Sequence, residues 1–210
     1  MRSLIATTTL TLLLATGCSQ APADAPAGTA LPPTPEVDPA GSHAGHDDHS
    51  GHEGDEAHNV LATAVLAPTA GNQVQGTLYV ARVGDQLRLG GEISGLGADT
   101  QHGFHIHEKG DCSAADGSSA GGHFNPTASE HGAVEGEVHH GGDMSNLVAD
   151  ANGNARVDAV LSAHVTAGDG SATDIIGRGL IVHADPDDYV SQPTGNAGAR
   201  LACAVITAAQ

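Results

Sequence analysis

The sequence predicts an all-β fold, a Greek-key β-barrel or sandwich. From Val60 onward the chain consists of short runs rich in Val, Ile and Leu, which are separated by Gly, Asp and Asn. Hairpin turn signals occur at 84–85 (Gly-Asp) and at 152–154 (Asn-Gly-Asn). A domain of about 150 residues can bury a full hydrophobic core, and evenly spaced short strands are typical of barrels and sandwiches.

The expected strands follow one another along this part of the chain. Residues 61–66, 74–83 and 86–93 are apolar runs, and the turn at 84–85 joins the second to the third. The segment 103–107 is the next expected strand. Four later runs complete the set, at 155–161, 174–176, 180–183 and 201–207. The sequence has no Trp and only two Phe and two Tyr, so we expect a core of aliphatic side chains.

Three regions of the chain differ in composition. Residues 1–17 begin with Met1-Arg2, continue as an apolar stretch and end in small residues, which is the form of a signal peptide and too short for a membrane span. Residues 18–58 are rich in Pro and Ala and then in His and Asp, so they are predicted to be a disordered tether. Residues 59–210 are the expected β-domain.

Cys18 directly follows the signal-like segment, in a form that resembles a bacterial lipoprotein signal. Cys18 would then be the lipidated first residue of the mature chain and a link to the membrane; the alternative is secretion after a nearby small residue. In both cases we expect export to the periplasm or cell envelope, where disulfides persist. The position after Cys18 is Ser19, where an Asp commonly signals retention in the inner membrane. The absence of Asp at this position favours an outer-membrane anchor.

The second half of the tether is rich in histidine. Short His-rich tracts bind metal ions loosely, so this tract could capture copper or zinc for delivery to a site. The alternative is a soluble acidic linker. The histidines concerned are His43, His46, His49, His52 and His58.

Histidines of the β-domain are spaced for metal binding. In a strand, residues two apart point to the same face, so His105 and His107 would aim at one point while Phe104 and Ile106 are buried behind them. More candidates follow in a Gly-rich stretch that reads as a long loop, a kind of segment that is usually functional or disordered. These later candidates are His123, His131, His140 and Asp143, with His183 at the end of an apolar run.

Six imidazoles and one carboxylate are about what two transition-metal ions need if one ligand is shared. The other histidines of the domain, His102, His139 and His164, are predicted to be solvated surface residues. His139 stands next to His140 and could substitute for it.

These segments resemble the copper,zinc superoxide dismutases, in a bacterial and exported form. The resemblance covers roughly residues 59–210, and it implies an immunoglobulin-like barrel of eight strands with long metal-binding and electrostatic loops. Its motifs are GFHIHEKGDC at 103–112, GGHFNP at 121–126, EHG at 130–132, HGGD at 140–143, GRGLIVH at 177–183 and GNAGARLAC at 195–203.

The resemblance implies one copper ion and one zinc ion per subunit. Four nitrogens suit a tetragonal Cu(II) site, whereas three nitrogens and a carboxylate oxygen suit a closed tetrahedral zinc site. His140 is preferred to His139 because it fits the spacing of the family motif. The implied copper ligands are His105, His107, His123 and His183, and the implied zinc ligands are His123, His131, His140 and Asp143.

Three further residues acquire roles from the resemblance. Asp187 matches a carboxylate that hydrogen-bonds one copper ligand and one zinc ligand, here His105 and His131; without the resemblance it would be an ordinary acidic loop residue. Cys112 and Cys203 match an intrasubunit disulfide, and closing a loop of this size stabilises a fold by roughly 4 kcal/mol.

The formal net charge of −18 is unfavourable for an anionic substrate, so the local field must matter more than the total charge. Arg200 matches the family's active-site arginine, which would attract and orient superoxide beside copper, and Thr194 matches a residue at the rim of the channel. The stretch 185–194 contains no Lys, and Lys109 is the candidate that compensates. No nucleic-acid partner is expected.

The implied reaction is dismutation of superoxide to oxygen and hydrogen peroxide, by alternate reduction and reoxidation of copper. In it His123 would leave reduced copper, take up a proton and give it to the forming peroxide. The competing hypothesis is a non-enzymatic periplasmic buffer of copper and zinc that uses the His-rich tract; the complete set of copper ligands favours the enzyme. Monomer and homodimer both remain open.

Overall fold

The computed structural model describes residues 59–210, so the signal segment, Cys18 and the histidines of the tether lie outside the described residues. Within that range no helix has the length and hydropathy needed to cross a membrane. The elements are β1 (Asn59–Pro68), β2 (Gln75–Val83), β3 (Gln86–Ser94), β4 (Gln101–His102), β5 (Phe104–His107), the 3-10 helix η1 (Ser118–Ala120), β6 (Leu147–Val148), β7 (Ala155–Val160), β8 (Gly179–His183) and β9 (Arg200–Ala208).

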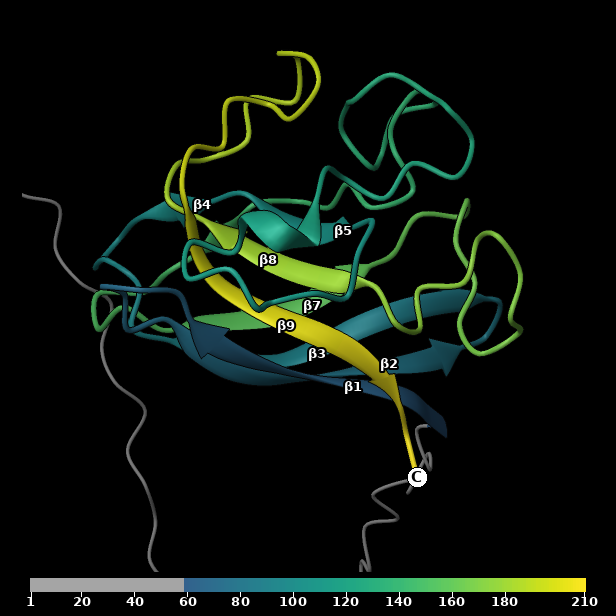
Figure 1. Cartoon of the computed structure of the whole chain (residues 1–210), viewed down its shortest axis with the longest axis horizontal. Helices are drawn as coiled ribbons and strands as arrows, with labels where there is room; N and C mark the ends of the chain where they lie inside the picture. Colours follow the sequence, from purple (N-terminus) through teal and green to yellow (C-terminus); the bar gives the residue numbers. More distant parts are fainter. Residues whose placement is uncertain (1–58) are drawn as a thin grey trace, which may run out of the picture. The chain divides into compact units, whose positions relative to one another are not determined.

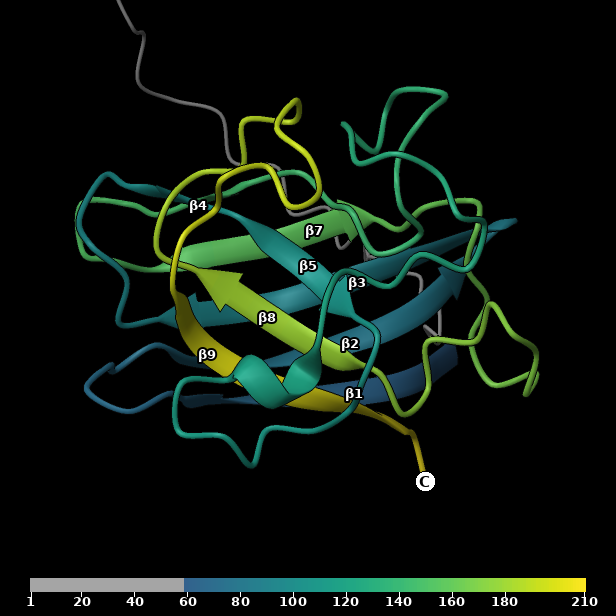
Figure 2. The ribbon, with the colours of Figure 1, turned by 45° about the horizontal axis from the view of Figure 1, so that its top comes forward.

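Seven strands form one antiparallel sheet in the order β5-β8-β9-β1-β2-β3-β7. Figures 1 and 2 show that this sheet curls, so that β5 and β8 lie across the core from β2 and β3. Strands distant in sequence are neighbours at β9-β1, β3-β7 and β5-β8, which is the Greek-key pattern. The predicted all-β Greek-key barrel is therefore confirmed.

The curled sheet encloses a core of mostly aliphatic side chains. In β1, Ala62, Ala64 and Leu66 are buried while Val65 between them is 66% exposed, which is the period-two pattern of a strand with one face in the core. Strands β5 and β8 differ from β1, because every one of their residues is buried. Loops must therefore cover the outer face of these two strands.

Two long connections provide this cover. One follows β5 and contains residues 108–146, and the other joins β8 to β9 through residues 184–199. Both rise from the same side of the barrel, over β5 and β8 in Figure 1. The histidine motifs of the first connection and Asp187 of the second are thereby brought to one place.

The expected strand at 174–176 is wrong. Asp174 makes only an isolated bridge to Thr166, and its carboxylate accepts main-chain N–H groups from Gly168, Gly170 and Ile176 at 2.7–2.9 Å. These hydrogen bonds satisfy the backbone locally, so the segment forms a turn instead of joining the sheet. The two-residue strands β4 and β6, which pair with each other, were not predicted because so short a strand has no periodicity.

Candidate metal centre

Seven buried side chains from β5, from the end of β8 and from the loop after β5 form two groups that could hold metal ions. In each group the possible ligand atoms lie within 4.8 Å of one another. The first group is His105, His107, His123 and His183, and the second is His123, His131, His140 and Asp143, so the groups share one residue.

Strand β5 contributes two residues of the first group. His105 and His107 turn to the site, whereas Phe104 and Ile106 between them pack into the core with 0% and 1% of their surface exposed. Strand β8 runs antiparallel beside β5 and ends at His183, where the pairing with β9 is irregular. The alternation of side chains along β5 and the end of β8 beside it thus bring three imidazoles together, those of His105, His107 and His183.

Hydrogen bonds fix which ring nitrogen of two histidines carries the proton. Nδ1–H of His107 donates to the carbonyl of Gly121 at 2.9 Å, and Nδ1–H of His183 donates to that of Gly198 at 3.3 Å. The Nε2 atoms, which then carry lone pairs, lie 3.3 Å apart. Two lone pairs at this distance repel each other unless a shared cation satisfies both.

The other two imidazoles of the first group have a nitrogen without a partner. His105 donates its Nε2–H to Asp187, and Nδ1 of His123 lies 2.8 Å from Asp143. The opposite atoms, Nδ1 of His105 and Nε2 of His123, are buried without a hydrogen-bond partner among residues 59–210. Buried polar atoms of this kind are costly, and a bound metal ion would satisfy them. The first group therefore fits an ion that accepts four nitrogen ligands.

Asp143 is the centre of the second group. Its Oδ1 lies 2.8 Å from Nδ1 of His123 and 3.4 Å from Nδ1 of His140, and its Oδ2 lies 3.0 Å from Nδ1 of His131. Nδ1 of His131 and Nδ1 of His140 are close to the carboxylate without the alignment of a hydrogen bond. Ligands of a tetrahedral zinc ion lie about 3.3 Å from one another, given zinc–ligand bonds of about 2.0 Å. The spacing and the three nitrogens with one oxygen therefore fit zinc.

Burial keeps three imidazoles of the first group, those of His107, His123 and His183, neutral. Burial lowers the pKa of His123 to about 4 and that of His183 to about 3. It also lowers the pKa of His107 well below its usual value, and the nearby His123 adds to the effect. Neutral imidazole is the form that binds metal ions, so protons do not compete for these nitrogens near neutral pH.

The second group behaves differently because it contains a carboxylate. Burial lowers the pKa of His131, but the adjacent carboxylate of Asp143 and the hydrogen bond to Asp187 outweigh it and raise the pKa to about 9. Burial alone would raise the pKa of Asp143, yet the three neighbouring imidazoles hold it well below its usual range. A metal ion that binds here must displace the proton of His131.

Asp187 lies between the two groups. Its Oδ2 accepts Nε2–H of His105 at 2.7 Å, and its Oδ1 accepts Nε2–H of His131 at 2.9 Å. Burial raises the pKa of Asp187, but these hydrogen bonds outweigh it and hold the carboxyl well below its usual range. Because each ring donates from Nε2, its Nδ1 faces the group to which it belongs. A carboxylate placed in this way orients ring nitrogens for a metal.

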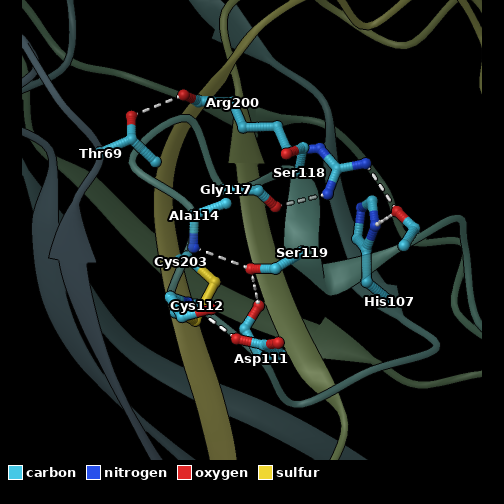
Figure 3. Close-up of a disulfide and its surroundings, with 12 residues drawn as sticks. Thr69, His107, Asp111, Cys112, Ala114, Gly117, Ser118, Ser119, Arg200 and Cys203 are labelled. Atoms are coloured by element: carbon cyan, nitrogen blue, oxygen red, sulfur yellow. Dashed lines mark hydrogen bonds between the residues drawn. A yellow bond between two sulfur atoms is a disulfide. The ribbon is translucent and has the colours of Figure 1, made fainter.

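The disulfide joins Cys112 in the loop after β5 to Cys203 in β9 (Figure 3), which confirms the predicted pairing. Ser119 ties the same loop together, since its Oγ donates to the carbonyl of Asp111 at 2.8 Å and accepts N–H of Ala114 at 3.1 Å. The disulfide thus fastens the loop to β9, and the Ser119 hydroxyl stabilises the loop itself.

Arg200, at the start of β9, is bound to that loop through its guanidinium (Figure 3). Nη1 donates to the carbonyl of Gly117 at 2.7 Å and Nη2 to the carbonyl of Gly121 at 2.6 Å. The Gly121 carbonyl therefore accepts from both Arg200 and His107. The guanidinium of Arg200 and the imidazole of His107 are thus bound to the same carbonyl oxygen.

Two amide side chains of the site were not predicted. Asn146 pairs with the main chain of Asp187, accepting its N–H at 2.8 Å and donating to its carbonyl at 2.9 Å. Gln192 pairs with the main chain of His131 in the same way, at 2.9 Å in both directions. The partners are 41 and 61 residues apart in the sequence, so no local spacing marks either residue.

The prediction that His102, His139 and His164 are solvated surface residues is wrong. His102 and His139 are each 5% exposed, and His164 is partly buried. Nδ1–H of His102 donates to the carbonyl of His183, which supports the end of β8. The ring of His139 stacks on that of His164 and lies 2.9 Å from the hydroxyl of Ser162. These rings contact residues from distant parts of the chain, which spacing in the sequence does not show.

Comparisons with known proteins agree with this geometry. Residues 74–206 match the family described as copper/zinc superoxide dismutase (SODC). "Superoxide dismutase [Cu-Zn] 2" of Aquifex aeolicus (strain VF5) is 39% identical over 154 residues, which are 71% of this chain and 88% of the relative. "Superoxide dismutase [Cu-Zn]" of Paramecium bursaria Chlorella virus 1 is 40% identical over 154 residues, covering 70% and 78%.

Solved structures agree with the fold. A SOD-like protein from Bacillus subtilis is 34% identical with a TM-score of 0.61, over 68% of this chain and 96% of that one. The clock protein EA4 is 34% identical with a TM-score of 0.63, over 79% and 99%. Family membership makes the protein an oxidoreductase with copper and zinc as cofactors, and the two groups of ligand atoms fit both ions. The chain belongs to the copper/zinc superoxide dismutase family.

Proposed function

We propose that copper binds to His105, His107, His123 and His183, that zinc binds to His123, His131, His140 and Asp143, and that His123 joins the two ions. The observation that carries this proposal is the environment of the two nitrogens of His123: Nδ1 lies 2.8 Å from Asp143 of the second group, and Nε2 is buried among the first group without a partner. Imidazole normally keeps one proton, but two dications can displace it.

The reaction of the family is superoxide dismutation, in which two superoxide anions and two protons give oxygen and hydrogen peroxide. Bound copper supplies the redox chemistry by alternating between Cu(II) and Cu(I), whereas zinc is redox-inert. Arg200 attracts and orients the anion, and the carbonyls of Gly117 and Gly121 hold its guanidinium in place. His123 takes up a proton at Nε2 and gives it to the product, and Asp187 keeps His105 and His131 in register.

The attraction of superoxide is local, because the whole chain carries a net charge of −18. Arg200 is partly buried, and burial lowers the pKa of its guanidinium without removing its charge. Lys109 contributes less, since its ammonium lies at the surface 4.0 Å from the carboxylate of Glu108. Arg200 is therefore the main cation for the substrate, and Thr194, in the loop between β8 and β9, forms part of the rim.

Stopped-flow measurement of superoxide decay tests the proposal. The protein is loaded with copper and zinc and compared with His123→Ala and with His164→Gln, a histidine outside both groups. Fast decay that is lost in His123→Ala and kept in His164→Gln supports a shared ligand. Equal decay in all three proteins contradicts it.

Deletion of residues 19–58 separates the enzyme from the metal-buffer alternative. An enzyme keeps its turnover once it is metallated, because every ligand proposed above lies in residues 59–210. A buffer that depends on the His-rich tract loses most of its capacity for copper and zinc. Metal content and superoxide decay, measured on the same samples, give the answer.

We further propose that the protein is exported and anchored in the outer membrane through a lipid on Cys18. The disulfide between Cys112 and Cys203 supports an oxidising compartment, because such bonds are rare in the cytosol. Mass spectrometry of the mature protein from membrane fractions tests the anchor. An acylated Cys18 is expected, and a soluble mature chain that begins elsewhere contradicts it.

A further inference from the structure

The loop between β8 and β9 holds His131 at two points. Asp187 binds the ring through Nε2–H, and Gln192 binds the main chain through both atoms of its amide. Both partners belong to residues 184–199, the connection that also contains Thr194. This loop thus forms hydrogen bonds with both the side chain and the backbone of His131, a member of the second metal group.

The pairing between Gln192 and His131 is reciprocal. Oε1 of Gln192 accepts N–H of His131, and Nε2 donates to its carbonyl, each at 2.9 Å. Two opposed hydrogen bonds between planar amides fix orientation as well as distance, as in a β-ladder. The side chain of Gln192 therefore determines how the loop lies against the backbone of a metal-group histidine.

The loop approaches so closely that one position accepts only glycine. A Cβ at Gly195 would clash with Oδ1 of Asp187 and would lie 2.7 Å from Nε2 of His131, and the φ of +62° at this residue also favours glycine. N–H of Gly195 donates to the carbonyl of Ser191 at 2.7 Å, which closes the turn around Gln192. The segment from Ser191 to Gly195 thus packs directly on the hydrogen bond that orients His131.

We infer that Gln192 is a positioning residue that couples metal binding at the second group to the order of the loop at 184–199. A metal ion that fixes His131 also fixes the N–H and carbonyl that Gln192 binds, so the loop gains order together with the group. Conversely, a loop held by Gln192 presents His131 in the orientation that the ion requires. This inference rests on the proposed assignment of zinc to His131.

Hydrogen exchange with and without zinc tests the coupling in the full mature protein. In the unaltered chain, zinc is expected to slow exchange of the loop amides, including those of Asp188, Gly195 and Ala197, which are hydrogen-bonded within or to the loop. In Gln192→Ala we expect this zinc-induced protection to shrink and the zinc dissociation constant to rise about tenfold, the effect of a net hydrogen bond or two.

Two further variants make the result specific. Gln75→Ala removes an exposed glutamine at the start of β2 and should behave as the unaltered chain does. Gln192→Glu keeps an acceptor for N–H of His131 but places an anion against the carbonyl of His131. Its zinc affinity and its loop protection should therefore lie between those of the unaltered chain and those of Gln192→Ala. A role in overall stability alone would instead change exchange in β1–β3 as well, and equally with and without zinc.

The outcomes separate this inference from the proposed function. If the unaltered chain fails to bind zinc when His131 and its group are intact, the zinc assignment is wrong. If it binds zinc but Gln192→Ala matches Gln75→Ala in zinc affinity and in loop protection, the assignment stands and the role of Gln192 is refuted. Loss of the zinc-induced loop protection in both Gln192→Ala and Gln75→Ala likewise refutes the role of Gln192.

Discussion

Removal of the disulfide should destabilise the metal-free domain by several kilocalories per mole. Cys112 and Cys203 are 91 residues apart, and closing a loop of this length removes about 4.5 kcal/mol of chain entropy from the unfolded state. A domain of about 150 residues has an unfolding entropy near 0.3 kcal/mol per degree, so the midpoint of thermal unfolding should fall by about 14 °C. The perturbation is Cys112→Ala combined with Cys203→Ala.

The assay is calorimetry of both proteins without metals, because bound ions would add their own stabilisation. The single variant Cys112→Ala should show nearly the same fall, since one substitution already removes the cross-link. A fall below about 3 °C in the double variant would refute the reasoning, because it would mean that the unfolded chain gains little freedom when the bond is absent.

Three other changes have expected outcomes. Asp187→Asn keeps the shape but turns an NH2 group toward a ring N–H, so chelator competition should show metal affinity about 10–100-fold weaker, and unchanged affinity would contradict the orienting role. Arg200→Gln should slow superoxide decay in stopped flow and reduce its dependence on ionic strength; an unaltered salt dependence counts against local attraction. The metal-free protein should lose stability as pH falls, because the folded pKa values of His123, about 4, and His183, about 3, lie below the unfolded value of 6.5. The unfolded state then binds more protons in the window between pH 6.5 and 3, so the unfolding midpoint should decrease through it, and a flat profile would refute the assignment of neutral imidazoles.

Most of the fold could be predicted because strand signals are local. The expected runs at 61–66, 86–93 and 201–207 lie within β1, β3 and β9, where alternation or β-branched composition is strong. The run at 174–176 has the same composition, but Asp174 binds the main chain of its own loop. Composition does not reveal that competition, because it depends on where the carboxylate points in three dimensions.

The residues of the candidate site also divide into those that the sequence marks and those that it does not. Spacing of two along a strand marks His105 and His107, and motifs shared with the family mark the other members of the two groups, which the structure brings together. Asn146 and Gln192 carry no such mark, because their partners are set by how the two long loops meet. His139 was expected in solvent for the same reason, since the ring on which it stacks lies on a later part of the chain.

The carbonyl of Gly121 accepts both Nη2–H of Arg200 and Nδ1–H of His107. Because one oxygen accepts both bonds, the guanidinium and the imidazole share a single reference point in the main chain. A displacement of this carbonyl would therefore affect the placement of both groups at once.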